Sequence, residues 1–159
     1  MHEKLISIVI PAFNESENIP KIVLAIENLF EQLPYRYEII MVADGCTDNT
    51  MDKIQELLST NKQLYYIEFS RNFGHQNALK AGLDHSNGDC VISLDCDMQH
   101  PPEIIPEMLA KWELGYEVVY TIRKEDKRLP VNKRVTSKLF YNTINKLSDV
   151  EIEPGSADF

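Results

Sequence analysis

Two carboxylates, Asp95 and Asp97, stand one residue apart directly after an apolar segment, and their spacing could hold a metal ion. Alternate residues of an extended chain point the same way, so both carboxylates can face one site at the end of a strand. Hard oxygen ligands suit Mg²⁺ or Mn²⁺, which commonly bridge a protein carboxylate to substrate phosphates. Aspartate is also common in turns, but further polar residues, including Gln99, follow at once. We therefore interpret the pair as functional.

The composition limits the class of protein. A chain of 159 residues fits one domain with a sizeable core, so we predict a single domain over residues 1–159. A formal net charge of −9 argues against nucleic-acid binding. Cys46, Cys90 and Cys96 lack the spacing of a zinc site or a disulfide framework, which favours a reducing compartment. No apolar run approaches the ~20 residues that span a bilayer, so we expect this segment itself to be soluble.

Positive charge is concentrated in one segment. Residues 123–138, called the basic island below, hold seven Lys and Arg residues against two acidic ones, a net +5 within a chain of −9. Such a run is often a solvated face, and the alternative is a site for phosphate or for an anionic membrane surface. Arginine suits phosphate because its planar fork can donate two hydrogen bonds.

Apolar strands alternate with helical patterns, which predicts an α/β protein with a mostly parallel central sheet flanked by helices. Pro11 is expected to stop the first strand, Ser16 to cap the first helix, and Thr47 or Asp48 to cap the second. The predicted strands are 5–10, 37–43, 64–69, 89–95 and 116–122, and the predicted helices are 16–30, 48–58, 74–85, one after Pro102, and 131–147.

A cluster of polar residues follows each of the first four predicted strands: PAFNES, ADGCTDNT, SRNFGHQN and DCDMQH. In parallel sheets ligands bind outside the carboxyl ends of the strands, where these clusters would converge. The glycine-rich fingerprints of dinucleotide-binding and P-loop proteins are absent. The sequence therefore predicts that phosphate is held by a metal and by side chains.

The segments IVIPAFNESENI, VADGCTDNT, SRNFGHQNALKAGL and GDCVISLDCDMQHPPE resemble, in order, the motifs of family-2 glycosyltransferases with the Rossmann-like GT-A fold. The nearest branch contains dolichol-phosphate mannosyltransferase and the bacterial polyprenyl-phosphate glycosyltransferases. The resemblance implies inverting, metal-dependent transfer of a sugar from a UDP- or GDP-linked donor to polyprenyl phosphate, in cell-envelope glycan or glycoconjugate synthesis. Two alternatives stay open: transfer to a glycan hydroxyl, and a non-catalytic nucleotide-sugar-binding module.

The resemblance also implies roles for individual residues. They are Pro11, Ala12, Asn14, Glu15, Asp44 and Asp95 for the nucleotide-sugar, Asp97 and Gln99 for Mg²⁺ or Mn²⁺, Arg123 and Arg134 for phosphate and acceptor, and Asp158 as the catalytic aspartate. Because a phosphate acceptor is already largely dianionic at neutral pH, our hypothesis is that Asp158 orients the acceptor or takes a residual proton.

The chain departs from the family pattern at two places. Ala43 stands where relatives often carry an acidic or amide residue. The contacts to the donor base, and hence the choice between a UDP-linked and a GDP-linked donor, therefore stay open. The chain ends at GSADF, inside a motif that normally continues with arginine, and relatives then add amphipathic and transmembrane helices. The resemblance therefore implies a truncated catalytic domain that works at the cytoplasmic face of a membrane, beside anionic lipid. Whether it forms a homo-oligomer stays open.

Overall fold

The computed structural model describes residues 3–99 and 101–121. The chain divides into two units, Met1–Tyr116 and Glu117–Phe159, and the sheet with its helices belongs to the first. The basic island, the predicted helix 131–147 and the predicted site residues Arg123, Arg134 and Asp158 lie outside the described residues. The single-domain prediction stays a prediction.

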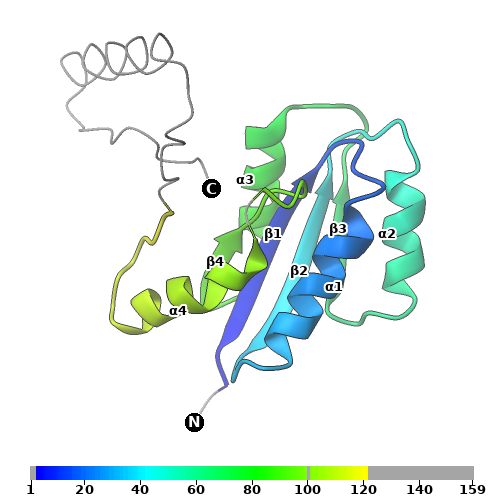
Figure 1. Ribbon diagram of the computed structural model, residues 1–159. Helices are drawn as coiled ribbons and strands as arrows, with labels where there is room; N and C mark the ends of the chain where they lie inside the picture. Colours follow the sequence, from blue (N-terminus) through cyan, green and yellow to red (C-terminus); the bar gives the residue numbers. More distant parts are fainter. Residues whose placement is uncertain (1–2, 100, 122–159) are drawn as a thin grey trace, which may run out of the picture. The chain divides into compact units, whose positions relative to one another are not determined.

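Four parallel strands form the sheet, in the order β3-β2-β1-β4 (Figure 1). They are β1 (Leu5–Ala12), β2 (Arg36–Ala43), β3 (Leu64–Glu68) and β4 (Cys90–Ser93). Parallel strands that are covered on both faces read as continuous apolar runs, and β1 and β2 have this composition. The predicted α/β class with a parallel sheet is confirmed.

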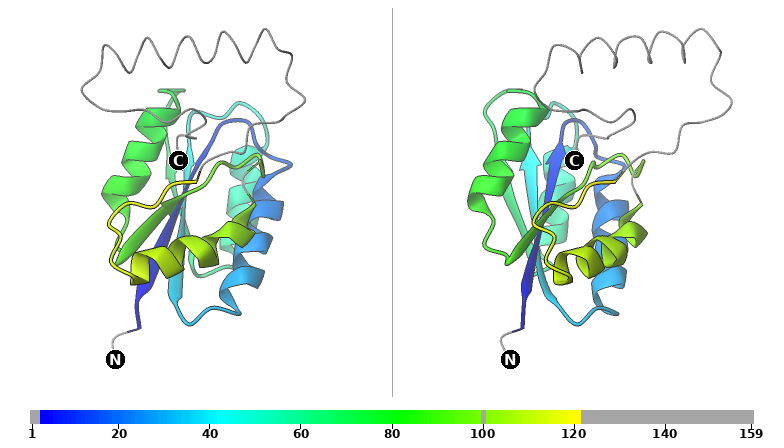
Figure 2. Two further views of the ribbon diagram at one scale, coloured as in Figure 1. Left: turned by 60° about the vertical axis from the view of Figure 1, so that its left-hand side comes forward. Right: turned by 90° about the vertical axis from the view of Figure 1, so that its left-hand side faces the viewer.

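Helices cover both faces of this sheet (Figures 1 and 2). One face carries α1 (Ile19–Phe30), α2 (Thr50–Leu58), the short helix η1 (Pro102–Ile104) and α4 (Ile105–Glu113), and the other carries α3 (His75–His85). Residues of β1 alternate between the two cores: Ile8 packs in the larger core beneath α1, and Val9 packs with Ala78 of α3. Within the described residues, no helix is long and apolar enough to cross a membrane.

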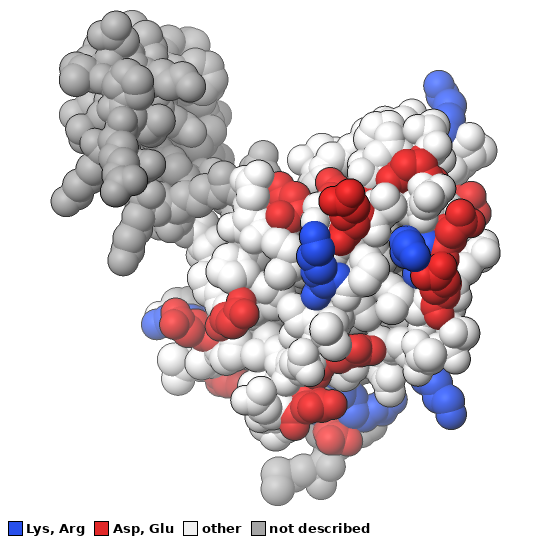
Figure 3. All heavy atoms as spheres, turned by 45° about the vertical axis from the view of Figure 1, so that its right-hand side comes forward, with Lys and Arg blue, Asp and Glu red and all other residues white. Residues whose placement is uncertain are grey.

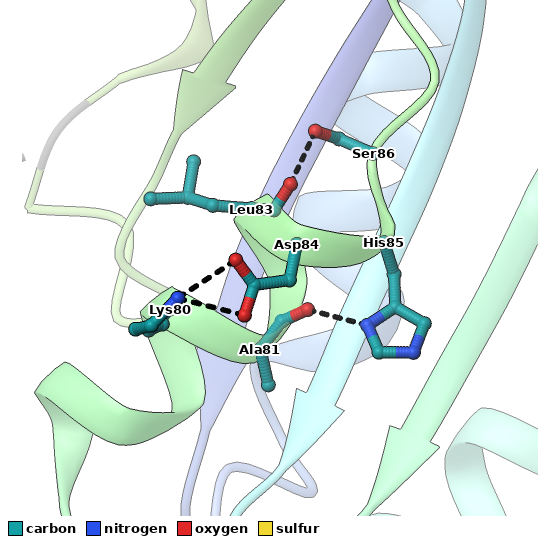
Figure 4. Close-up of polar contacts among 6 residues, drawn as sticks. All are labelled: Lys80, Ala81, Leu83, Asp84, His85 and Ser86. Carbon is teal, nitrogen blue, oxygen red and sulfur yellow. Dashed lines mark hydrogen bonds and ion pairs between the residues drawn. The ribbon is translucent and has the colours of Figure 1, made fainter.

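Helix α3 lies unusually close to the sheet and ends in a compact turn. A Cβ added at Gly82 would stand 2.2 Å from Cγ1 of Val9, so only glycine permits this approach. At the carboxyl end, Nδ1 of His85 donates to the Ala81 carbonyl and the Ser86 hydroxyl donates to the Leu83 carbonyl (Figure 4). These side-chain bonds add to the backbone bond from the Ser86 N–H to the Leu83 carbonyl at the end of α3, and the helix packs against β1 and β2.

A buried polar cluster joins the β2 strand to the loop before β4. The Ser7 hydroxyl, fully buried, donates to Oε1 of Glu38 at 2.5 Å, and the Asn87 N–H donates to the same oxygen at 2.8 Å. The Gly88 N–H in turn donates to Oγ of Ser7. The cluster thus ties β1, β2 and the loop before β4 together.

A second set of side-chain contacts lies at the edge of the sheet where the strands begin. Nζ of Lys4 lies 2.7 Å from Oε2 of Glu113 and 4.5 Å from the centre of the Trp112 ring. The Tyr35 hydroxyl donates to the other oxygen of Glu113. These contacts hold the end of α4 against the starts of β1 and β2.

The ends of β1 and β4 were predicted wrongly, and one predicted strand is absent from the described residues. Strand β1 continues through Pro11 to Ala12, because pairing with β4 already ends at Ser93. The carbonyl of Ala12 accepts from Asp44 on the β2 side, so the neighbouring proline nitrogen faces the side where no ladder bond is needed. The predicted fifth strand is absent from residues 116–121, which form no ladder and leave Val118 79% exposed.

Candidate functional site

A cleft of about 450 Å³ lies at the carboxyl ends of the strands, where the sequence predicted a ligand site. Six of the predicted residues line it, namely Pro11, Ala12, Glu15, Asp44, Asp95 and Asp97. Six lining residues were not predicted, namely Phe13, Asn72, Gly74, His75, Ala78 and Cys96. The loops after all four strands therefore contribute to one cavity.

Asp95 and Asp97 reach the cleft by a route that differs from the expectation. Strand β4 ends at Ser93, so both carboxylates lie beyond it, Asp95 just after the strand and Asp97 in a turn. Met98 adopts φ of 60°, and the Gln99 N–H donates to Oδ1 of Asp97 at 2.9 Å, which closes the turn. Both carboxylates still line the same cleft, with the buried Cys96 between them.

Hydrogen bonds from backbone N–H groups to side-chain oxygens join the loop after β1 to the start of α2 beside the cleft. The Glu15 N–H donates to Oγ1 of Thr50 at 2.8 Å, and the Ser16 N–H donates to Oδ2 of Asp48 at 3.4 Å. Oδ1 of Asp48 accepts from the Thr50 N–H at 3.0 Å. Burial raises the pKa of Asp48, but the hydrogen bonds from Thr50 and Ser16 outweigh it and leave the pKa below the ordinary value.

The same loops correct the predicted helix caps. Helix α1 begins at Ile19, because the chain first makes a turn in which the Asn18 and Ile19 N–H groups both donate to the Glu15 carbonyl. Ser16 therefore lies inside that turn and does not cap the helix. Asp48, one of the two predicted caps of α2, does accept from the first helical N–H, although Asn49 occupies the cap position.

Asn14 belongs to this junction and does not line the cleft. Its φ is 58°, a left-handed conformation that asparagine tolerates better than most residues. Its Oδ1 accepts from the Thr47 N–H at 2.8 Å. Asn14 thus fixes the shape of the loop that carries Glu15.

Replacing Thr50 with valine is expected to destabilise the protein by about 1–3 kcal/mol, because the partly buried Glu15 N–H loses its acceptor. Thr50→Ser keeps the hydroxyl and is the matched control, with a smaller loss. The free energies of unfolding in urea measure both changes. A valine variant as stable as the wild type would show that the hydrogen bond from the Glu15 N–H to Oγ1 of Thr50 contributes nothing to stability.

The cleft is acidic. Glu15, Asp44, Asp95 and Asp97 all line it, and no Lys or Arg of the described residues does. Figure 3 shows acidic and basic side chains interspersed on one face, without a continuous basic patch there. Burial, reinforced by neighbouring carboxylates including Glu15, raises the pKa of Cys96 to about 12, so its thiol stays neutral.

The donor set fits a divalent cation that is shared with a ligand. No group of three or more His, Cys, Asp or Glu residues in the described part of the chain could hold a metal by itself. Mg²⁺ is commonly bound through one or two carboxylates and substrate phosphates, and Asp95 and Asp97 supply carboxylates of this kind. An anionic ligand would also be repelled by four carboxylates unless a cation lay between them.

Solved structures with the same fold are glycosyltransferases of the GT-A type. The mannosyltransferase PcManGT from Pyrobaculum calidifontis, in complex with GDP-Man and Mn²⁺, matches with a TM-score of 0.61 at 22% identity, over 91% of this chain and 39% of that one. Glucosyl-3-phosphoglycerate synthase from Mycobacterium tuberculosis, in complex with Mn²⁺, UDP and phosphoglyceric acid, matches with a TM-score of 0.62 at 22% identity, over 96% and 54%. The fold is therefore GT-A, as expected.

Residues 7–157 match the family described as Glycosyl transferase family 2, and the chain belongs to that family. The bactoprenol glucosyl transferase of Shigella phage SfV is 41% identical over 157 residues, which cover 97% of this chain and 50% of that protein. The uncharacterized glycosyltransferase sll0501 of Synechocystis is 38% identical over 154 residues, which cover 97% and 48%. The chain thus spans about half the length of these relatives.

Proposed function

We propose that this chain is the donor-binding and catalytic part of a glycosyltransferase that moves a sugar from a UDP- or GDP-linked donor to a polyprenyl phosphate. The observation that carries the proposal is the acidic cleft at the carboxyl ends of the strands. The name of the bactoprenol glucosyl transferase supports the acceptor, and the nucleotides and Mn²⁺ in the two solved complexes support the donor and the metal.

In this proposal the donor lies along the loop after β1. Pro11, Ala12 and Glu15 would face its nucleoside, with Asp95 on the same side. Asp97 would hold Mg²⁺ or Mn²⁺ together with Gln99, whose N–H donates to Oδ1 of Asp97. Such a cation supplies charge stabilisation to the diphosphate that leaves. The junction of Asn14, Asp48 and Thr50 keeps Glu15 in place while the donor binds.

The acceptor half of the proposal concerns residues outside the described range. Arg123 and Arg134 would align the acceptor phosphate through bidentate hydrogen bonds. The acceptor oxygen attacks the anomeric carbon on the face opposite the leaving diphosphate, which inverts the configuration, and Asp158 orients the acceptor. The basic island would attract anionic lipid at the cytoplasmic face of the membrane, at about 1 kcal/mol per basic residue near the surface.

A thermal-shift panel tests the donor. UDP, GDP and ADP are compared with and without Mn²⁺, and we expect a marked rise in melting temperature for UDP or GDP only when Mn²⁺ is present. A chain that responds to none of them, or to all equally without metal, would contradict the proposal.

Transfer assays with the full-length protein separate the alternatives for the acceptor. Labelled donor is offered with undecaprenyl phosphate or with an oligosaccharide, and product on the lipid alone is expected. Product on the oligosaccharide would favour the glycan-hydroxyl alternative. Donor binding without turnover on either acceptor would favour a non-catalytic nucleotide-sugar-binding module.

A further inference from the structure

Asp44 has an unusual environment for a residue expected to meet the donor base. Its side chain lies at the end of β2, and the residue is only 3% exposed. Oδ1 accepts from the Phe73 N–H at 2.7 Å, and Oδ2 accepts from the Gly74 N–H at 2.9 Å. Both carboxylate oxygens are therefore engaged by the backbone of the loop that precedes α3.

The neighbouring residue, Gly45, brings the same loop into direct backbone contact. Gly45 has φ of +64°, and a Cβ added there would lie 2.1 Å from the carbonyl carbon of Arg71 and 2.3 Å from N of Asn72. The Phe69 N–H donates to the Ala43 carbonyl at 2.9 Å, where β3 ends. Residues 43–45 thus bond to Phe69, Phe73 and Gly74 and lie against the backbone of Arg71 and Asn72. The loop 70–74 is called the docked loop below.

The docked loop determines where α3 begins. Gly74 has φ of +94°, and His75 is the first residue of the helix. Nε2 of His75 lies 3.9 Å from Oδ1 of Asp95, which is beyond hydrogen-bond range, and its side chain is 49% exposed. The helix itself is held firmly, through Ala78 and Gly82 on the sheet and through the end shown in Figure 4.

The cleft offers few side-chain donors to an anionic ligand. Among the described residues that line it, Asn72 and His75 carry side-chain N–H groups that can donate to an anion, and His75 is the one that lies beside Asp95. Its place beside Asp95 puts it next to the turn that carries Asp97. An imidazole there can donate to a diphosphate oxygen that the carboxylates would repel.

We infer that Asp44 is a positioning residue that acts on the donor through the docked loop, and that His75 is the side chain this loop delivers to the donor diphosphate. The inference rests on the proposed function for its ligand, a nucleoside diphosphate. Asp44 was expected to contact the donor base. In this inference its carboxylate instead accepts from the Phe73 and Gly74 N–H groups and has no contact with the base. Discrimination between UDP and GDP then does not depend on the Asp44 carboxylate.

A double-mutant cycle tests the connection. Affinity for UDP and GDP is measured by calorimetry with Mn²⁺ for the wild type, D44N, H75A and the double variant. In D44N an amide N–H₂ faces a backbone N–H, so the loop loses one of its two acceptors.

We expect D44N and H75A each to weaken binding by about tenfold. The double variant should be weaker than D44N by less than about threefold, with the ratio of UDP to GDP affinity unchanged. H75Q, which keeps an N–H donor, should retain part of the affinity.

Amide hydrogen exchange, measured without nucleotide, tests the contact between Asp44 and the docked loop independently of donor binding. Exchange of the Phe73 and Gly74 amides should accelerate at least about tenfold in D44N, whereas that of Ile8 in the central strand should not change. Additive losses in the cycle, a changed ratio of UDP to GDP affinity, or unchanged exchange at Phe73 and Gly74 would each overturn the inference. If the wild type binds no nucleotide, the proposed function and the donor role of His75 both fail. Exchange at Phe73 and Gly74 would then still decide whether Asp44 holds the loop.

Discussion

Replacing Asp97 with alanine is expected to remove the Mn²⁺-dependent part of nucleoside diphosphate binding. The cleft keeps three other carboxylates, Glu15, Asp44 and Asp95, so a diphosphate without its cation meets net repulsion. We expect a loss of affinity of roughly a hundredfold, which corresponds to about 2.7 kcal/mol. Calorimetric titrations with UDP and GDP, each with and without Mn²⁺, measure the change.

Asp52→Ala is the matched control for Asp97→Ala. It removes the same charge from the exposed first turn of α2, away from the cleft. Its affinity should stay within about twofold of the wild type, because exposed charges are well screened. Asp95→Ala should weaken binding both with and without Mn²⁺, since Asp95 is assigned to the nucleoside side of the donor. Unchanged affinity and unchanged Mn²⁺ dependence in Asp97→Ala would remove the assigned metal site.

Replacing Glu38 with leucine is expected to lower the free energy of unfolding by about 2–4 kcal/mol. The Ser7 hydroxyl and the Asn87 N–H both donate to Oε1 of Glu38, and both would lose their acceptor in a buried setting. Glu38→Gln keeps a carbonyl oxygen at that position and should retain most of the stability. Urea unfolding measures the two variants, and a leucine variant as stable as the wild type would falsify this account of the cluster.

The strands and helices were predictable because they depend on the pattern of apolar residues within each segment. The apolar runs of β1 and β2 and the helical stripe of α1 are visible in the sequence, and the structure places them within a few residues of the predicted ranges. The ends of the strands were less predictable, because they depend on where the neighbouring strands of the sheet stop. Pro11 remains in β1 since β4 stops short of it, and residues 116–121 form no strand although most of them are apolar or aromatic.

The site was predictable to the level of loops but not of every side chain. The clusters after the strands identified the cleft, and six predicted residues line it. His75 and Asn72 lie within the SRNFGHQN cluster, so their loop was recognised while they received no role. The partners of Asp44 are the backbone amides of Phe73 and Gly74, and a backbone amide leaves no signature in an amino-acid sequence.

The parallel arrangement of the strands has a practical consequence for biosensor measurements. All four strands run toward the cleft, so the start of β1 lies at the opposite edge of the sheet (Figure 1). Just before it, Lys4 contacts Glu113 and Trp112. A surface linkage placed just before Lys4 would orient every immobilised molecule with its cleft toward the flowing analyte. Since all copies would then present the same accessible face, binding curves for UDP and GDP should fit a single class of sites.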